Sequence, residues 1–151
     1  MLSKKTQYAL KAMVGLASKP IGVPVMIADL AEQERLPKKF LELILLDLKS
    51  LGVVQSKKGK QGGYYLSRAP EEIKIGQIMR GIEGPLALLP CVSQSQYKRC
   101  DECVDERLCG LRLVMKDVRD ATAKILDNTS LADVHDRVER ERVKPEVMFH
   151  I

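Results

Sequence analysis

Residues 26–66 read MIADLAEQERLPKKFLELILLDLKSLGVVQSKKGKQGGYYL, and their apolar residues change period partway along the stretch. Helical spacing predicts a short helix from about Met26 to Gln33 and a longer one that begins at Pro37 and ends at Gly52. A short strand, a turn rich in lysine and glycine, and a second strand then follow. Two helices and a basic hairpin in this order predict a winged helix-turn-helix, in which the second of these helices enters the DNA major groove.

Four further helices are expected outside this stretch. Periodic apolar residues predict one helix over about residues 4–18, another over about 73–82, a long helix from about Asp105 and a short final helix from Leu131 to Glu139. Ser130 is placed to cap the last of these. We therefore expect a mainly α fold with a small β-hairpin wing. Its parts, in chain order, are a winged helix-turn-helix domain (1–83), a cysteine-rich loop (84–104), and a dimerisation helix with a short C-terminal helix and tail (105–151).

The charge of the chain is unevenly distributed. Residues 1–68 carry 12 Lys and Arg against 5 Asp and Glu, a net charge of +7, whereas residues 69–151 carry 13 against 15, a net charge of −2. A basic half beside a nearly neutral half indicates a nucleic acid partner for the first half and another task for the second. The alternative, on charge alone, is a solvated surface rich in lysine.

Basic residues lie at both places where a winged helix-turn-helix meets DNA. Lys38 and Lys39 fall in the first turn of the third helix, where base edges are read. Lys57, Lys58 and Lys60 fall on the hairpin, whose glycines let the backbone approach phosphates closely. The alternative is that three amphipathic helices and a hairpin form only a common small core. Basic residues at both positions favour binding to double-stranded DNA.

The long helix carries apolar residues at steps of three and four, the seam typical of two helices that pack against each other. These residues are Leu108, Leu111, Met115, Val118, Thr122 and Ile125. Because the helix is long for so small a domain, we expect the seam to pack against a second copy of the chain in a homodimer. The alternative is that it lies back on its own domain.

The four cysteines of the chain lie close together, as Cys91-x8-Cys100-x2-Cys103-x5-Cys109. Four soft thiolates in one short stretch suit a metal or an iron–sulphur cluster. Three interpretations stay open: an iron–sulphur cluster, a structural zinc, or free thiols that form a disulphide on oxidation. Only one interval has the tight spacing of a zinc knuckle. Three cations flank the run and are expected to lower the pKa values of its thiols: Lys98, Arg99 and Arg107.

The sequence gives no sign of catalysis. It contains no Ser/His/Asp set and no phosphate-binding glycine loop, and we assign no role to His135 or His150. The chain begins with an amphipathic helix rather than a signal peptide, and no window is apolar enough for a membrane span, so a reducing cytoplasm is expected. An iron–sulphur electron carrier or a module that docks on an enzyme is the remaining alternative, although neither would need the basic hairpin.

Several segments, taken in order, resemble one family of proteins. They are SKKTQYALKAM (3–13), LPKKFLE (36–42), LGVVQSKKGKQGGYYL (51–66), the cysteine-containing loop (82–109) and NTSLADV (128–134). These segments are similar to the opening helix, recognition helix, wing, cluster loop and last helix of the IscR-like bacterial transcription regulators. That family includes the iron–sulphur cluster regulator, the nitric-oxide-sensing repressor, the rhizobial iron regulator and the cysteine-metabolism repressor. The resemblance covers nearly the whole chain.

The resemblance implies a homodimer that binds a two-fold operator, with one winged helix in each half-site. It also implies a 2Fe–2S or 4Fe–4S cluster in the loop, whose state alters DNA binding. Glu42 would meet the bases, where its carboxylate can accept a hydrogen bond from a cytosine amino group; the alternative is an ordinary acid on the helix surface. By position, the resemblance places base contacts at Lys39, Phe40 and Glu42, a wing contact at Lys58, and phosphate contacts near Lys4, Lys5, Thr6 and Tyr8.

The loop departs from the family pattern, which has three cysteines at two x5 intervals. This chain keeps only the last interval and adds Cys100. Arg112 stands where the cluster regulator has a histidine ligand, and Gln7 where the nitric-oxide sensor has an aspartate. Cys100 is therefore expected to complete an all-cysteine site within one subunit.

The function expected from these features is that of a transcriptional repressor that senses redox, iron or nitric-oxide status. A cluster held between Cys91 and Cys109 would fix the DNA-reading domain relative to the dimer axis. A regulator without a cluster, which uses thiol oxidation or zinc, is the alternative.

Overall fold

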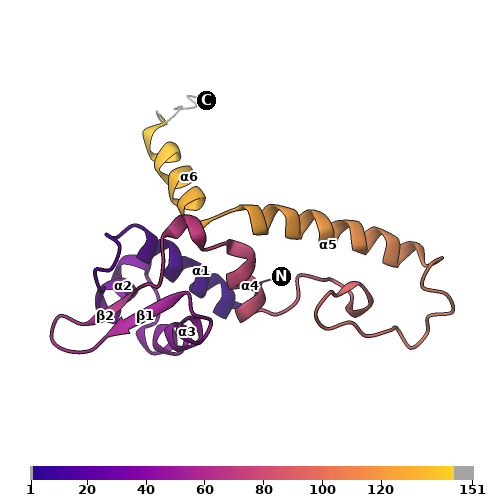
Figure 1. The fold of residues 1–151 in the computed structure, drawn as a ribbon, viewed down its shortest axis with the longest axis horizontal. Coiled ribbons are helices and arrows are strands. Elements are labelled where there is room, and N and C mark those ends of the chain that lie inside the picture. Colours follow the sequence, from indigo (N-terminus) through magenta and orange to yellow (C-terminus); the bar gives the residue numbers. More distant parts are fainter. Residues whose placement is uncertain (1, 145–151) are drawn as a thin grey trace, which may run out of the picture.

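The computed structural model describes residues 2–144. Its elements are, in chain order, α1 (Lys4–Ala17), α2 (Ile27–Glu34), α3 (Lys38–Ser50), β1 (Val54–Lys57), β2 (Gly63–Leu66), the 3-10 turn η1 (Pro70–Glu72), α4 (Ile75–Ile82), the 3-10 turn η2 (Pro90–Val92), α5 (Gly110–Asn128) and α6 (Leu131–Val143). A winged domain contains α1 to α4 with the β1–β2 hairpin, and α5 and α6 project from it (Figure 1). The loop between α4 and α5 runs out beneath α5 and returns to its start.

An aliphatic core holds the winged domain together. From α3, Leu41, Ile44, Leu45 and Leu48 face inward, at the steps of three and four residues that place side chains on one face of a helix. Other buried apolar residues of this core are Ala9, Ala12, Met13, Leu16, Leu30, Ala31, Leu36, Val53, Val54, Leu66, Ile73 and Ile78. Because one face of α3 supplies the core, its opposite face is directed outward.

The β1–β2 hairpin is antiparallel, and Val54 pairs with Leu66 at its base. Backbone hydrogen bonds of 2.8 Å in both directions join Tyr64 to Val25, so the segment before α2 extends the sheet. Gly63 permits this approach, because its φ is +151° and a Cβ there would lie 2.2 Å from the Val25 carbonyl oxygen. The base of the wing is thus fixed to the domain, while the turn that bears the lysines projects from it.

Backbone hydrogen bonds also tie the far end of α5 to the winged domain. The amide of Ile75 donates to the carbonyl of Thr129 at 2.9 Å, and the amide of Leu131 donates to that of Ile73 at 3.0 Å. Leu131 is fully buried, and Ser130 caps α6 as the sequence predicts. The junction of α5 and α6 therefore belongs to the core, whereas α5 itself contains no buried residue.

The predicted fold class, mainly α with a β-hairpin wing, is confirmed. Most boundaries agree within about two residues, but α6 continues to Val143 and α5 begins at Gly110 instead of about Asp105. The late start of α5 has a local cause: the Asp105 carboxylate accepts from the Arg107 amide at 2.8 Å and closes a turn. Leu108 consequently lies before the helix. The predicted tail after 144, with His150, lies outside the described residues.

Within residues 2–144, no helix combines the length and the apolar character needed to cross a membrane.

Candidate nucleic-acid interface and cysteine pocket

The outward face of α3 presents residues expected to meet DNA. Lys38, Lys39 and Glu42 are all exposed in its first turns. Figure 1 shows α3 and the β1–β2 hairpin on the lower side of the molecule, with α5 and α6 on the upper side. A duplex could therefore lie along α3 and the wing without meeting the projecting helices.

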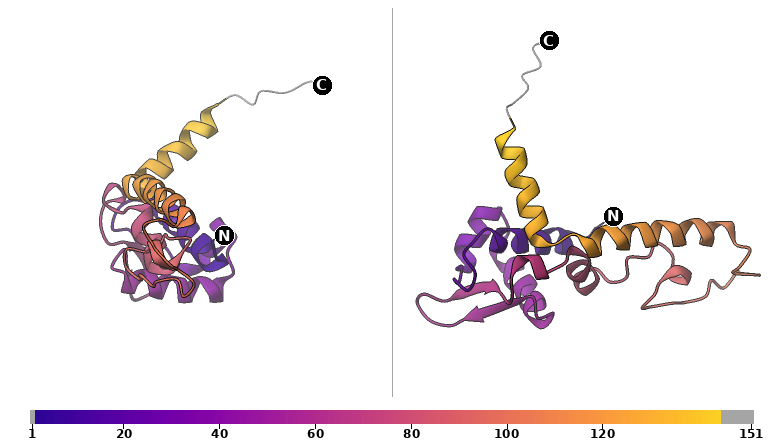
Figure 2. Two further views of the ribbon diagram at one scale, coloured as in Figure 1. Left: turned by 90° about the vertical axis from the view of Figure 1, so that its right-hand side faces the viewer. Right: turned by 45° about the horizontal axis from the view of Figure 1, so that its top comes forward.

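The wing adds a second group of cations. Lys57, Lys58 and Lys60 are exposed, and the hairpin extends beyond the helices in the right-hand view of Figure 2. A groove of about 530 Å³ separates the wing from the start of α2, and Lys19, Lys57 and Lys60 are among its lining residues. Several ammonium groups around one groove suit the phosphate backbone of a nucleic acid.

The start of α1 supplies fewer surface groups than the resemblance implies. Lys4 is exposed, but the Lys5 ammonium lies 2.6 Å from the Asp47 carboxylate of α3. Thr6 is fully buried and its hydroxyl binds within the protein. The phosphate contact expected near Thr6 is therefore corrected: its side chain lies on the inner face of α1 and anchors the helix.

Tyr8 and Phe40 also have a packing role. Their ring centroids are 5.7 Å apart and their planes meet at 82°, an edge-to-face pair between α1 and α3. Both residues are half-buried against the core. Both rings stay partly exposed beside this pairing, so the base contact expected of Phe40 and the phosphate contact expected of Tyr8 stay predictions.

Glu83 joins the start of the cysteine loop to the start of α1, a contact that the sequence analysis missed. Its carboxylate accepts hydrogen bonds from the Ser3 amide at 3.1 Å, the Ser3 hydroxyl at 2.7 Å and the Thr6 hydroxyl. Ser3 is itself the N-cap of α1. The hydrogen bond from Thr6, followed by those from Ser3, lowers the pKa of Glu83. One carboxylate thus connects the loop to the helix beside the expected DNA surface.

Substituting Glu83→Gln is expected to remove part of the acid sensitivity of folding. A carboxyl with a lowered pKa stabilises the fold above its ordinary pKa, about 4.3 for Glu, and this contribution is lost as pH falls through the lowered value. The variant should therefore be less stable than wild type at neutral pH and approach it in acid. Urea unfolding at several pH values measures the difference. Glu71→Gln, which removes an exposed carboxylate in η1, is the control, and an equal effect there would contradict the role of Glu83.

All four cysteines line one pocket of about 370 Å³ between the loop and the start of α5. Cys91 is buried within η2, and Cys109 is the N-cap residue of α5. Cys100 and Cys103 share a turn closed by a backbone hydrogen bond of 3.2 Å between them. The fold therefore gathers around a single pocket the four thiols of η2, of the Cys100–Cys103 turn and of the start of α5.

These thiols are not arranged as a ready-made metal site. Among the side chains that the structure describes, no three of Cys, His, Asp or Glu are grouped closely enough to hold a metal ion. The Cys100 thiol instead donates to the Glu102 carboxylate at 3.4 Å. The Glu102 backbone amide lowers the pKa of Cys100, but the Glu102 carboxylate, partial desolvation and the neighbouring Cys103 outweigh it, so the pKa lies above its ordinary value.

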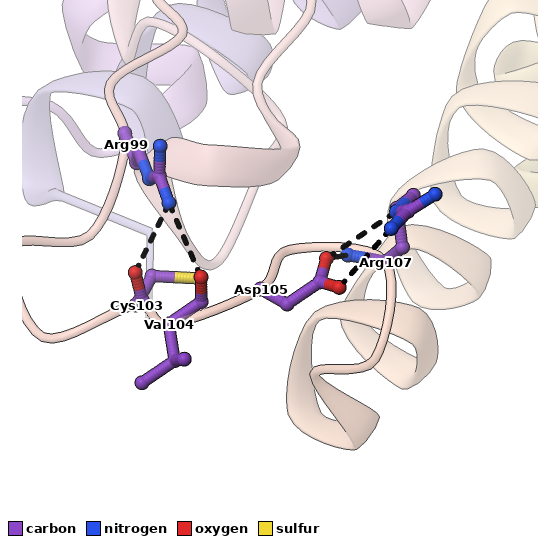
Figure 3. A network of polar contacts seen from close by, with 5 residues as sticks. All are labelled: Arg99, Cys103, Val104, Asp105 and Arg107. Carbon is purple, nitrogen blue, oxygen red and sulfur yellow. Dashed lines mark hydrogen bonds and ion pairs between the residues drawn. The ribbon is translucent and has the colours of Figure 1, made fainter.

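The cations beside the cysteines bind oxygen atoms of the loop (Figure 3). The Arg99 guanidinium donates to the carbonyl of Cys103 at 3.1 Å and to that of the next residue at 3.5 Å. The Arg107 guanidinium lies 3.4 Å from the Asp105 carboxylate. The expectation that these cations lower thiol pKa values is therefore wrong for Cys100. Arg99 instead shapes the turn that carries Cys103, and Arg107 closes the turn at Asp105.

Arg112 places an unused donor at the pocket wall. It lines the same pocket as the cysteines. Within residues 2–144 its Nε is buried and has no hydrogen-bond partner. An unpaired buried donor costs free energy, which an acceptor in the pocket would recover. Sequence reasoning considered Arg112 only as a replaced ligand and missed this role.

One face of α5 is held against the molecule. Arg80 of α4 makes a two-pronged contact with Asp127, with one N···O distance of 2.9 Å, and the Arg119 side chain donates to the Val92 carbonyl. The hydrogen bond between Arg80 and Asp127 raises the pKa of the guanidinium and lowers that of the carboxyl. These contacts fix α5 to α4 and to η2.

The predicted seam of α5 is divided between its covered and free faces. Met115 and Thr122 are half-buried, on the side of the helix that carries Arg119. Exposed small or apolar residues form a neighbouring stripe at steps of three and four: Leu111, Val114, Val118, Ala121 and Ile125. Leu108, which precedes the helix, is exposed. The exposed apolar stripe is therefore offset around α5 from the predicted seam, and it includes Val114.

Comparison with known proteins agrees with this winged helix-turn-helix architecture. A family model described as an iron-dependent transcriptional regulator, Rrf2, matches residues 2–137. An rrf2-like HTH-type transcriptional regulator of Rhodobacter capsulatus is 41% identical over 137 residues, which span 89% of this chain and 91% of that protein.

Solved structures agree with these matches. CymR, the global cysteine regulator of B. subtilis, has a TM-score of 0.75 at 28% identity, over 91% of this chain and 97% of that chain. IscR of T. potens has a TM-score of 0.73 at 29% identity, over 99% of this chain and 96% of that chain. The relatives are transcriptional regulators and not enzymes, in agreement with the expectation from the sequence.

Proposed function

Because this chain belongs to the Rrf2 family of transcriptional regulators, we propose that it is a dimeric repressor whose operator binding is set by an iron–sulphur cluster. The family establishes a DNA-binding regulator. Beyond this, we propose the cofactor, the residues that hold it and the way in which it changes DNA binding. The observation that carries it is that all four cysteines line one pocket at the junction of the loop and α5.

The pocket fits an iron–sulphur cluster in its ligands and in its unused donor. Thiolates are the usual ligands of such clusters, and Cys91, Cys103 and Cys109 would supply three of them. Cys100 is the candidate for the fourth, because the guanidinium of Arg112 cannot ligate iron. The buried Nε of Arg112 could donate to a ligating sulphur, a contact that tunes such sites. A bound cluster would supply chemistry that responds to oxidants, iron supply or nitric oxide.

The loop is well placed to affect the recognition helix because its start is tied to the winged domain and its end leads into α5, whose far end is tied to the same domain. Glu83 ties its start to α1, and Cys109 opens α5, whose far end is held by Asp127 and Leu131. Drawing Cys91 and Cys109 toward a common centre would hold the first half of α5 against the loop. The angle between α5 and the winged domain would then be fixed, and with it the spacing of two recognition helices in a dimer.

The exposed stripe of α5 supports the homodimer. A row of apolar side chains from Leu111 to Ile125, at steps of three and four, is the pattern by which two helices pack together. Isolated exposed leucines are common, but a continuous apolar stripe marks an interaction surface. Two copies joined along this stripe would present two winged domains to the half-sites of a two-fold operator.

Anaerobically purified protein is expected to be brown and to contain iron and acid-labile sulphide. A duplex selected from a random library by the protein provides the operator, and its affinity is then compared between the loaded and the metal-free forms. The cluster proposal predicts that the two affinities differ. Colourless protein that holds zinc or no metal would overturn it.

A second candidate is favoured by the likeness to CymR, which is described as a cysteine regulator. In that case the thiols themselves would carry the signal, and the exposed Cys100 is the most accessible of them. Metal-free protein whose operator affinity changes with a thiol oxidant, and recovers with a reductant, would select this candidate over the cluster.

A further inference from the structure

Two leucines of α3 are exposed on the face that is directed away from the core. Leu43 is 59% exposed and Leu46 is 52% exposed. The inward face of α3 is already supplied by fully buried residues such as Ile44 and Leu48. The core therefore gives no reason for leucine at these two positions.

The two leucines share their stripe with the residues expected to meet DNA. Lys39, Leu43 and Leu46 follow one another at steps of four and three residues, which places them in a row along one side of the helix. Glu42 lies beside this row and is also exposed. The stripe therefore combines a cation, an acid and two branched apolar side chains, a mixture that an ordinary solvated face does not need.

The charge around the stripe identifies the partner as DNA rather than another protein surface. Lys38 and Lys39 lie at its start, and the wing lysines lie on the same side of the molecule (Figure 1). The helix α5, which carries the other apolar stripe, lies on the opposite side of the molecule from α3 (Figure 1), so the two leucines do not continue that stripe. An apolar pair framed by cations fits a groove whose edges are phosphates and whose floor has apolar methyl groups.

We propose that Leu43 and Leu46 read the C5-methyl groups of thymines in the major groove of the operator. This inference rests on the placement of α3 in that groove proposed above. The thymine methyl is the apolar group that the major groove offers, and apolar side chains are its natural contacts. Leu43 is nearer the N-terminus of α3, the part of a recognition helix that reaches base edges, and is expected to have the larger effect.

The neighbouring acid makes the expected operator more specific. Glu42 can accept a hydrogen bond from the amino group of cytosine, which thymine lacks. Because Glu42 and Leu43 are adjacent in sequence but point in different directions around α3, they would contact neighbouring base pairs. Each half-site is therefore expected to contain a thymine close to a cytosine.

Replacing single thymines by uracil tests the inference, because the exchange removes the methyl group and leaves the base pairing intact. The operator is the duplex selected by wild-type protein, in whichever form, loaded or metal-free, binds more tightly. At a contacted position, uracil should weaken wild-type binding about fourfold, the effect expected of one buried CH₂. Other thymines of the same duplex serve as internal controls.

Leucine variants assign the effect to the protein. Leu43→Ala should lose the uracil sensitivity at one position, and Leu46→Ala at another, in double-mutant cycles. Leu43→Gln, which is similar in size, should shift the preferred base at its position from thymine toward adenine. Both leucines are exposed, so these variants should fold as wild type does, and unfolding curves verify this.

The outcomes separate this inference from the proposed function. If wild type binds the selected duplex but no uracil exchange weakens it, the methyl contacts do not exist and the DNA-binding proposal stands. If the uracil effect survives in both alanine variants, other residues read the methyl groups and the inference is overturned. If no duplex is selected from the library in either form, the operator proposal itself fails.

Discussion

Replacing Cys103 by serine is expected to remove most of the iron from the purified protein and to abolish the difference in operator affinity between its loaded and metal-free forms. Serine keeps the size of the side chain but offers a hard hydroxyl instead of a soft thiolate. Cys103 lines the pocket with the other cysteines and lies in the turn shaped by Arg99. Iron and sulphide assays, together with binding titrations of both forms, measure the effect. Cys109→Ser should behave in the same way.

Val104→Ser is the matched control for this substitution. It introduces the same side chain at the next residue of the same turn, where valine is 95% exposed, and removes no thiol. This variant should keep the iron content and the operator response of wild type. Cys100→Ser then shows whether the additional cysteine is a ligand. If Cys103→Ser and Cys109→Ser both retain the wild-type response, the pocket does not regulate DNA binding.

The winged domain could be predicted from the sequence because local patterns specify its elements. The apolar spacing of α3 and the change to a strand period after Gly52 are both read within a few residues. The sequence predicts too early a start for α5, because Leu108 fits the helical period although it lies before the helix. A turn closed by the Asp105 side chain precedes the helix, which therefore begins later. The spacing of apolar residues cannot predict such a turn.

The candidate site was predictable in composition but not in arrangement. The sequence identifies the cysteines and the lysines, whereas the contact between Glu83 and Ser3 joins residues 80 positions apart and follows no local pattern. The place of Thr6 along the chain predicts a contact with DNA, whereas its helical spacing with Ala9 and Met13, both buried, indicates the inner face of α1. The exposure of Leu43 and Leu46 could also be predicted from the sequence, because these leucines do not fit the helical spacing of the residues of α3 that form the core.

Removing cations from α3 and the wing is expected to reduce both operator affinity and its dependence on salt. Each lysine that contacts a phosphate displaces counterions, so each lost contact should lower the slope of log affinity against log salt by about 0.9. Lys38→Ala and Lys58→Ala, alone and combined, test one exposed cation from each element. Their effects on the slope should add, because the residues lie on separate elements.

Lys124→Ala provides the comparison for these variants, since it removes the same charge from the exposed surface of α5. A general effect of net charge would change the salt slope in all three variants alike, whereas phosphate contacts should change it only for the variants in α3 and the wing.

The salt slope also separates the roles of neighbouring residues of α3. Leu43→Ala should weaken binding at constant slope, because it removes an apolar contact, and Lys38→Ala should lower the slope on every sequence tested. If Lys38→Ala weakens binding to every duplex and Leu43→Ala weakens binding only where a thymine is present, the two results together would show which side of α3 faces the bases.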